Sequence, residues 1–215
     1  MFLDEKYTAM PWDKIDNVVF DIGNVLMEYN PPRYARLLFT EDERLQREMV
    51  SIVHESPYWV RLDEGTLTRQ EAIIYMTRER PELRPQAQLL LDNFVRISRP
   101  VQEGCEAVVQ CRAMGKKLYL LSNYHNQAFE ELRKVLPIVD TFDGEIISAR
   151  VKQLKPHDDI YQTLLKTYEL NPTRTVFIDD TPANAEGAVH NGMEAICYRV
   201  PGQLNRFFGK EMCNP

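Results

Sequence analysis

The sequence lacks an excess of basic residues. Its 215 residues include 26 Lys and Arg against 32 Asp and Glu, for a formal net charge of −6. A nucleic-acid-binding surface needs concentrated positive charge, so we expect no nucleic-acid partner. Long apolar runs are also absent, and the first residues include Asp4 and Glu5 without an apolar segment. We therefore expect no export signal, no membrane span and a cytoplasmic location.

Cysteine is rare, and the spacing of the cysteines matches no common motif. The four cysteines, Cys105, Cys111, Cys197 and Cys213, form no CxxC pair and show no metal-ligand spacing. A chain of 215 residues with 44% apolar content can bury a full core, so it does not depend on disulfides. We predict reduced thiols. The four histidines share no ligand spacing either, and only His125 is expected near a functional site.

Short apolar runs predict the strands of a parallel sheet. The first, at 18–20, ends at Asp21, and a glycine follows two places later. Such runs are typical of strands buried on both faces, and helical patterns alternate with them. The predicted fold is therefore α/β, with a Rossmann-like parallel sheet core. The remaining extended segments are expected at 117–121, 144–147, 175–178 and 195–198, and the alternating helices at 101–114, 127–136, 158–168 and 183–190.

A helical segment interrupts this alternation. Pro31 and Pro32 are interpreted as a boundary that excludes helix, and the pattern from 33 to 98 is helical with no strand signal. We predict an inserted α-helical cap. Its helices are indicated by capping-box spacing of Thr40 with Glu43 and of Thr68 with Glu71, and by an apolar periodicity over 86–97.

The predicted domains follow from these boundaries. They are an α/β core over 14–30 and 100–215, a helical cap over 31–99 and an N-terminal extension over 1–13. Because the cap follows the strand that ends at Asp21, we expect it to close over the site as a lid. Arg61, Asp63 and Glu64 are expected in a polar loop of this cap, where Arg61 or Glu64 would influence substrate preference.

Polar residues stand where the predicted strands and loops end. They are Asp21, Ser122-Asn123, Lys155 and Asp179-Asp180. Ligands of open α/β sheets bind at the carboxyl ends of the strands, so we expect these groups in one crevice. Three carboxylates this close repel one another unless a metal neutralises them, and hard oxygen ligands suit Mg2+. Lys and Ser donors suit a phosphoryl group, so the partner expected is a small phosphorylated substrate.

These residues lie in four motifs that together resemble those of the haloacid dehalogenase superfamily. The motifs are Phe-Asp-Ile-Gly-Asn-Val-Leu at 20–26, Leu-Leu-Ser-Asn at 120–123, Lys155-Pro156, and Val-Phe-Ile-Asp-Asp at 176–180 with Asn184. The first is also similar to that of α-glucose-1-phosphate phosphatases and of the phosphatase domain that precedes soluble epoxide hydrolase. The resemblance implies a Mg2+-dependent phosphatase of a small metabolite, with a sugar 1-phosphate as the expected substrate.

The resemblance also implies a role for each matching residue. Asp21 corresponds to the nucleophile that forms an aspartyl-phosphate, which water then hydrolyses. Ser122 and Asn123 correspond to phosphate-site residues, and Lys155 to the cation that neutralises the phosphate and Asp21. The implied metal ligands are Asp21, the carbonyl of Gly23, and Asp180, with Asp179 in the first or second coordination sphere and Asn184 either in the second sphere or capping its helix.

Two positions depart from the family pattern. The position two places after the nucleophile usually holds an Asp that acts as general acid and base, and here it is Gly23. The departing oxygen would then leave unprotonated or take a proton from water or from a neighbour such as His125, which favours acidic leaving groups. The usual Lys-Pro-Asp-Pro is here Lys155-Pro156-His157-Asp158, which keeps the lysine.

Two alternatives to a phosphatase are open from the sequence. A 2-haloacid dehalogenase uses the same Asp nucleophile on carbon but needs no metal, so Asp179 and Asp180 argue against it. A binding or regulatory protein could keep the fold, metal and phosphate site without useful turnover, which the absence of a carboxylate at Gly23 would permit.

Overall fold

The computed structural model describes residues 12–208, so residues 1–11 of the expected N-terminal extension and Cys213 lie outside the described residues. Within them, five parallel strands form one sheet in the order β3-β2-β1-β4-β5. The strands are β1 (Asn17–Phe20), β2 (Lys117–Ser122), β3 (Gly144–Ile147), β4 (Thr175–Asp179) and β5 (Glu194–Cys197). The prediction of an α/β fold with a parallel sheet is confirmed, and the strands begin and end within one residue of the expected positions.

The register of the three central strands aligns their C-terminal ends. Phe20 of β1 pairs with Leu120 of β2 and with Ile178 of β4. The residues that follow these pairs therefore reach the same edge of the sheet, which is where such folds bind ligands. Asp21, Ser122 and Asp179 are placed at that edge by strand pairing alone.

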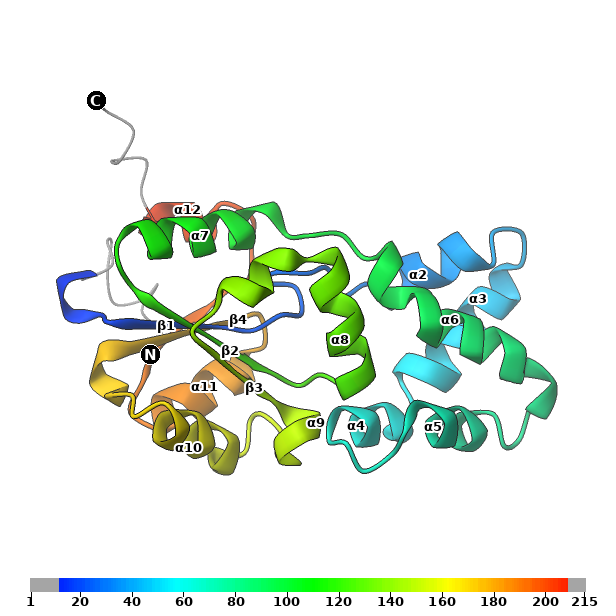
Figure 1. The fold of residues 1–215 in the computed structure, drawn as a ribbon. Helices are drawn as coiled ribbons and strands as arrows, with labels where there is room; N and C mark the ends of the chain where they lie inside the picture. The colour runs from blue at the N-terminus through cyan, green and yellow to red at the C-terminus, as the bar shows by residue number, and fades with distance from the viewer. Residues whose placement is uncertain (1–11, 209–215) are drawn as a thin grey trace.

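Successive residues of β1 pack on opposite faces of the sheet. Val18 and Phe20 belong to one hydrophobic cluster and Val19 to another. This two-sided burial explains the uninterrupted apolar runs that predicted the strands. Helices cover both faces (Figure 1), with α7 (Gln102–Ala113), α8 (Asn126–Val135) and α12 (Gln203–Phe208) on one and α10 (Asp158–Thr167) and α11 (Pro182–His190) on the other.

Five α-helices lie between β1 and α7, and we call residues 31–99 the insert. Figure 1 shows its helices side by side at one end of the sheet. The interpretation of Pro31 and Pro32 as excluding helix is wrong, because they are the first two residues of α2. A proline at these positions lacks only an N–H that would have no helical partner, and the Asn30 side chain caps the helix by accepting from Arg33 N. The helices of the insert are α2 (Pro31–Leu38), α3 (Glu43–Met49), α4 (Pro57–Asp63), α5 (Arg69–Met76) and α6 (Arg84–Ile97).

One of the two predicted capping boxes is wrong. α3 begins at Glu43 with Asp42 as its N-cap, and the Asp42 side chain accepts from Leu45 N at 2.8 Å. A carboxylate next to the first helical residue takes the place that Thr40 was expected to fill. The box of Thr68 with Glu71 is present at the start of α5. Shorter helical turns complete the chain at η1 (Trp12–Lys14), the π-helical η2 (Val50–His54), η3 (Pro81–Leu83), η4 (Pro137–Thr141), α9 (Ser148–Val151) and η5 (Pro172–Arg174).

The two segments that join the insert to the sheet run antiparallel to one another. Met27 and Pro100 form an antiparallel bridge. Glu28 N donates to the Arg99 carbonyl at 2.8 Å, and Val101 N donates to the Leu26 carbonyl at 2.9 Å. The insert therefore leaves and re-enters the core through one hydrogen-bonded pair of segments.

A buried ion pair also holds the insert against the core. The Arg69 side chain at the start of α5 is 1% exposed, and its Nη1 and Nη2 each donate to Glu131 of α8 at 2.9 Å. Asp92 of α6 lies 3.0 Å from Nη1. A buried guanidinium is costly without charged partners, so this network favours contact between the insert and α8.

Three of the four cysteines lie in the described part of the chain. Cys105, Cys111 and Cys197 are free thiols. In the described part of the chain, no helix has the length and apolar character needed to cross a membrane.

We predict that Glu131→Gln lowers the free energy of unfolding by about 2 kcal/mol, because Arg69 stays buried while losing one of its two charged partners. The matched control is Glu130→Gln, since Glu130 pairs with the more exposed Arg150 (side chains 52% and 35% exposed), and we expect a loss below about 0.5 kcal/mol. Urea denaturation of the three proteins measures both effects. Equal losses in the two variants would contradict a structural role for the Arg69 network.

Candidate active site

Asp21 continues β1 by one residue at its C-terminal end. It is 7% exposed, and its backbone N–H donates to the Ile178 carbonyl of β4 at 2.9 Å. Its Oδ1 accepts a 2.6 Å hydrogen bond from Ser122 Oγ at the end of β2. The parallel register thus brings the two groups of the first and second sequence motifs into direct contact.

Lys155 lies between two carboxylates. Its Nζ is 2.8 Å from Asp21 Oδ1 and 2.7 Å from Asp179 Oδ2, and its side chain is 1% exposed. Burial lowers the pKa of Lys155, but the adjacent Asp179 and Asp21 outweigh this effect and raise the pKa above its ordinary value. Lys155 is therefore a buried cation.

Asn123 fixes the backbone of Lys155. Asn123 Oδ1 accepts from Lys155 N at 2.9 Å, and Asn123 Nδ2 donates to the Lys155 carbonyl at 3.0 Å. Asn123 was expected to bind substrate, and it does line the pocket. Its two hydrogen bonds show that it also positions the lysine.

The carboxylate of Asp179 is fully buried, and both of its oxygens accept hydrogen bonds. Its oxygens accept hydrogen bonds from Thr181 N at 2.8 Å, from Lys155 Nζ at 2.7 Å and from Asn184 Nδ2 at 3.1 Å. Of the two roles left open for Asn184, the structure places its side chain on Asp179, and the N-cap of α11 is Thr181. Asp179 is not among the residues that line the pocket described below, whereas Lys155 is.

Asp180 is held by a residue that the sequence analysis did not identify. Asn24 Nδ2 donates to Asp180 Oδ2 at 2.9 Å, and Asn24 Oδ1 accepts from Tyr29 N at 2.8 Å. Asn24 has a φ of +51°, in the left-handed region that Asn tolerates better than most residues. Its position directly after Gly23 in the first motif was the available signal.

The three carboxylates carry more negative charge than Lys155 offsets. Asp21, Asp179 and Asp180 each offer an oxygen within 4.8 Å of the others. Burial raises the pKa of Asp21 to about 6, although Lys155 and Ser122 favour its ionised form. Burial also raises the pKa of Asp180, against the hydrogen bond from Asn24. An oxygen-only, electron-rich set of this kind fits a hard divalent cation such as Mg2+.

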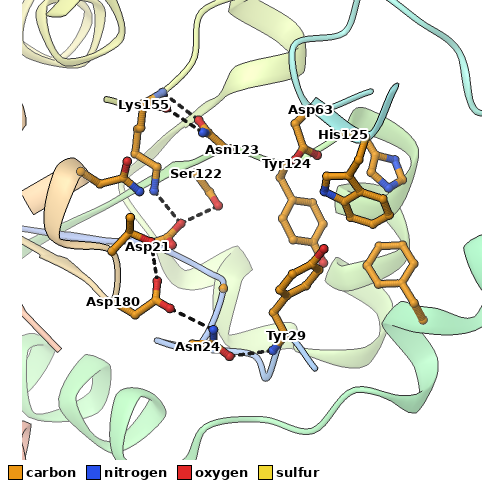
Figure 2. Close-up of a pocket in the computed structure, with 15 residues that line it drawn as sticks. Asp21, Asn24, Tyr29, Asp63, Ser122, Asn123, Tyr124, His125, Lys155 and Asp180 are labelled. Atoms are coloured by element: carbon orange, nitrogen blue, oxygen red, sulfur yellow. Dashed lines mark hydrogen bonds and ion pairs between the residues drawn. The ribbon is translucent and has the colours of Figure 1, made fainter. Parts of the chain in front are cut away.

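A pocket of about 320 Å3 adjoins these charged groups. Figure 2 shows Asp21, Ser122, Lys155 and Asp180 on one side of it, facing Tyr29, Tyr124, His125 and Asp63 on the other. The rings pack on one another, since the centroid of Trp59 lies 5.9 Å from Tyr29, 5.6 Å from Phe94 and 5.8 Å from His125. We call this side the aromatic wall, made of Tyr29, Trp59, Phe94, Tyr124 and His125. Apart from His125, the sequence analysis did not identify the residues of this wall.

Asp63 lines the pocket, whereas Arg61 and Glu64 do not. The expectation of a polar loop is wrong for Arg61 and Asp63, because both belong to α4. The Asp63 side chain accepts hydrogen bonds from the Trp59 side chain and from the His125 backbone N–H. Burial raises the pKa of Asp63 well above its ordinary value. Arg61 is exposed and Glu64 accepts from Thr66 Oγ1 at 3.1 Å.

His125 also lines the pocket, as a buried residue at the start of α8. Its Nδ1 accepts a 3.4 Å hydrogen bond from Ala128 N, so its hydrogen is on Nε2. Burial lowers the pKa of His125 to about 3, and the ring is therefore neutral near pH 7. A neutral imidazole is a weak acid, so His125 is poorly suited to protonate a leaving group.

We predict that, in metal-free buffer, the free energy of unfolding of Asp21→Asn increases relative to that of the wild-type protein as pH rises. The pKa of Asp21 is raised from 3.8 to about 6 in the folded state. The native protein therefore keeps a proton that the unfolded chain has lost, and wild-type stability falls as pH rises through this interval. The variant lacks this titration, so its free energy of unfolding relative to wild type should increase by on the order of 1 kcal/mol between about pH 5 and about pH 8. Urea denaturation in EDTA measures this difference, and a pH-independent result would contradict the raised pKa.

Comparison with known proteins gives one family and several relatives. A family model described as haloacid dehalogenase-like hydrolase matches residues 15–192. A sesquiterpene phosphatase of Aspergillus oryzae is 22% identical over 175 residues, covering 81% of this chain and 85% of its own. A phosphorylated carbohydrates phosphatase of Thermotoga maritima is 25% identical over 194 residues, covering 89% of this chain and 88% of its own.

Solved structures share the fold. A haloacid dehalogenase family enzyme from Bacteroides thetaiotaomicron, in complex with magnesium and inorganic phosphate, aligns with a TM-score of 0.71 at 18% identity, over 87% of this chain and 96% of its own. The L-2-haloacid dehalogenase of Xanthobacter autotrophicus, with chloropropionic acid covalently bound, aligns with a TM-score of 0.63 at 20% identity, over 84% and 76% of the two chains. At these identities the structures establish the fold alone. The reaction has to be inferred from the residues of the site.

Proposed function

The chain belongs to the haloacid dehalogenase-like hydrolases, and we propose that it is a Mg2+-dependent phosphatase acting through an aspartyl-phosphate. The observation that carries the proposal is Lys155, whose ammonium bridges Asp21 and Asp179 beside Asp180. One buried cation among three carboxylates leaves room for a second, divalent charge, which a phosphate ester needs and a haloacid does not. Curated relatives that are named as phosphatases support the same reaction.

In the proposed reaction, a carboxylate oxygen of Asp21 attacks phosphorus while the ester oxygen of the substrate leaves. Ser122 and Lys155 contact Asp21 Oδ1 at 2.6 and 2.8 Å, so both are placed to donate to phosphoryl oxygens as negative charge develops on them. Water then attacks the phosphorus of the aspartyl-phosphate, which releases phosphate and restores Asp21. Asn123 acts by hydrogen-bonding the backbone of Lys155 and so positioning the lysine.

The proposed metal ligands are Asp21, Asp180 and the carbonyl of Gly23. Asp179 was also expected near the ion, but its oxygens are occupied by Lys155, Thr181 and Asn184. We therefore assign it the role of orienting Lys155. When bound, the ion supplies positive charge that offsets the carboxylates and the substrate phosphate.

The proposed substrate is a monoester with an uncharged leaving group. Among the described residues that line the pocket, Lys155 is the only lysine or arginine, so a second phosphate would find no cation there. The aromatic wall offers ring faces on which the C–H groups of a sugar can pack. We propose a sugar 1-phosphate, in line with the form of the first motif, and the helical insert as the cap domain that encloses it over the α/β core of 14–30 and 100–215.

We predict that the wild-type protein hydrolyses p-nitrophenyl phosphate with Mg2+, and that Asp21→Asn lowers kcat by at least about 10³-fold because the amide cannot form the acyl-phosphate. Asp13→Asn, a change of the same chemistry at an exposed residue, serves as control and should retain full activity. Steady-state release of p-nitrophenol measures all three. Activity that survives in Asp21→Asn would refute the proposed nucleophile.

We further predict that Mg2+ raises the melting temperature of the wild-type protein. Binding at about 100 times the Kd adds about 2.7 kcal/mol to the native state, which corresponds to an increase of roughly 5–10 °C. Asp180→Asn should remove most of this increase, because it deletes a proposed ligand, while Asp158→Asn on α10 should preserve it. A thermal-shift titration with MgCl2 is the measurement, and an undiminished response in Asp180→Asn would place the ion elsewhere.

A further inference from the structure

Gly23 leaves the proposed reaction without the acid that the family pattern places at this position. An alkyl or sugar oxygen departs slowly unless it is protonated, and general acid catalysis contributes about 10²–10⁴-fold. Lack of space does not explain the glycine, because a Cβ at Gly23 would have Asp21 Oδ2, 3.8 Å away, as its nearest neighbour. The proton donor should therefore be sought on another wall of the pocket.

The other titratable groups of the pocket are poor acids or already engaged. Lys155 is bound by Asp21 and serves as the phosphate cation in the proposed function. His125 is neutral and caps α8. The hydroxyl of Tyr29 lies 3.0 Å from His54 Nδ1, and burial raises the pKa of both Tyr29 and Tyr124. Asp180 lies on the same side as Asp21 and is a proposed metal ligand, so Asp63 remains as the carboxyl group of the opposite wall.

We propose that Asp63, supplied by the helical insert, is the general acid and base of this site. Figure 2 shows it across the pocket from Asp21. In an in-line attack the leaving oxygen lies on the side of phosphorus opposite the nucleophile, and so toward the wall that holds Asp63. The assignment rests on the proposed phosphatase function and deepens it. It also replaces His125 as the first candidate for the proton donor.

The core holds Asp63 in this position from two directions. Its backbone carbonyl accepts a hydrogen bond from Ser148 Oγ of α9, and its carboxyl group accepts one from the His125 backbone N–H at the start of α8. The turn that follows is in contact with α9, since a Cβ on Gly65 would lie 2.2 Å from the Ala149 carbonyl oxygen. Asp63 is therefore a residue of the insert whose position depends on contact with the core.

In the first step, the protonated Asp63 gives its proton to the ester oxygen as the bond from that oxygen to phosphorus breaks and the bond from Asp21 to phosphorus forms. The alcohol leaves neutral, and Asp63 is left as a carboxylate. In the second step, this carboxylate takes a proton from the attacking water as the new phosphorus–oxygen bond forms and Asp21 is released. Asp63 ends the cycle protonated, so no other acid or base is consumed.

The surroundings of Asp63 favour a protonated carboxyl near neutral pH. Burial raises its pKa well above the ordinary value, the negative charge of Asp21 raises it further, and the Trp59 and His125 hydrogen bonds and Lys155 only partly oppose this. The other titratable groups around it, Tyr29, Tyr124 and His125, stay uncharged, because burial raises the pKa of the two tyrosines and lowers that of the histidine. A neutral acid on this wall also avoids repelling the incoming phosphate.

The test compares two leaving groups in the same proteins. Single-turnover phosphorylation of Asp21 is measured with p-nitrophenyl phosphate, whose phenol leaves without protonation, and with a sugar phosphate that the wild-type protein hydrolyses. Asp63→Asn should slow the sugar phosphate by about 10²-fold or more and the aryl phosphate by less than about 3-fold. Asp13→Asn, the same change at an exposed residue that does not line the pocket, should change neither rate. Gly23→Asp in the Asp63→Asn background should restore much of the sugar phosphate rate, because it returns an acid to the family position.

The outcomes separate this assignment from the proposed function. The burst amplitude with p-nitrophenyl phosphate counts folded sites, so partial misfolding of Asp63→Asn is corrected for. Equal slowing of both substrates per folded site, or no slowing of the sugar phosphate, would overturn the role of Asp63 and leave the phosphatase intact. A wild-type protein that forms no phosphoenzyme from either substrate would overturn the phosphatase, and the Asp63 assignment with it.

Discussion

The buried contact of Lys155 with Asp21 and Asp179 is the interaction on which the site depends. Burying the ammonium group of Lys155 costs much free energy unless carboxylates lie beside it, and burying each carboxylate is costly unless a cation lies beside it. The three residues come from the ends of β1 and β4 and from the loop before α10, so the sheet register has to be correct for the charges to balance. Asn123 adds two hydrogen bonds that hold the backbone of Lys155. The sheet register therefore brings the three charged residues together, and their pairing in turn favours that register.

The pocket combines two kinds of surface that come from different parts of the chain. The sheet edge supplies charge and hydrogen-bond donors, whereas the insert supplies Trp59, Phe94 and Asp63. Apolar rings next to an ion cluster lower the local dielectric constant, which strengthens every electrostatic interaction with the phosphoryl group. The same low polarity explains why carboxyl groups on both walls hold their protons more tightly than free Asp does.

The strands and the residues at their ends could be predicted because both depend on local pattern. Apolar runs buried on two faces identified β1, β2 and β4, and the residues that follow these runs gave Asp21, Ser122 and Asp179. Asp63 and Asn24 could not be found this way, since their importance depends on which distant segment they meet. Pro31 was misjudged for a related reason: proline stops a helix in its interior but suits its first turn, and the sequence pattern alone did not show on which side of the boundary the helix lies.

The pairing of Met27 with Pro100 has an evolutionary consequence. It places the two ends of the insert next to each other, so a short turn from Leu26 to Val101 would close the chain without disturbing any strand order. The insert is thus a module that can be lengthened, shortened or exchanged while the sheet edge keeps its geometry. Because this module carries Asp63 together with Trp59 and Phe94 of the aromatic wall, a lineage could acquire a new leaving group and a new acid together, in one recombination event, while the nucleophile and its cation stay unchanged.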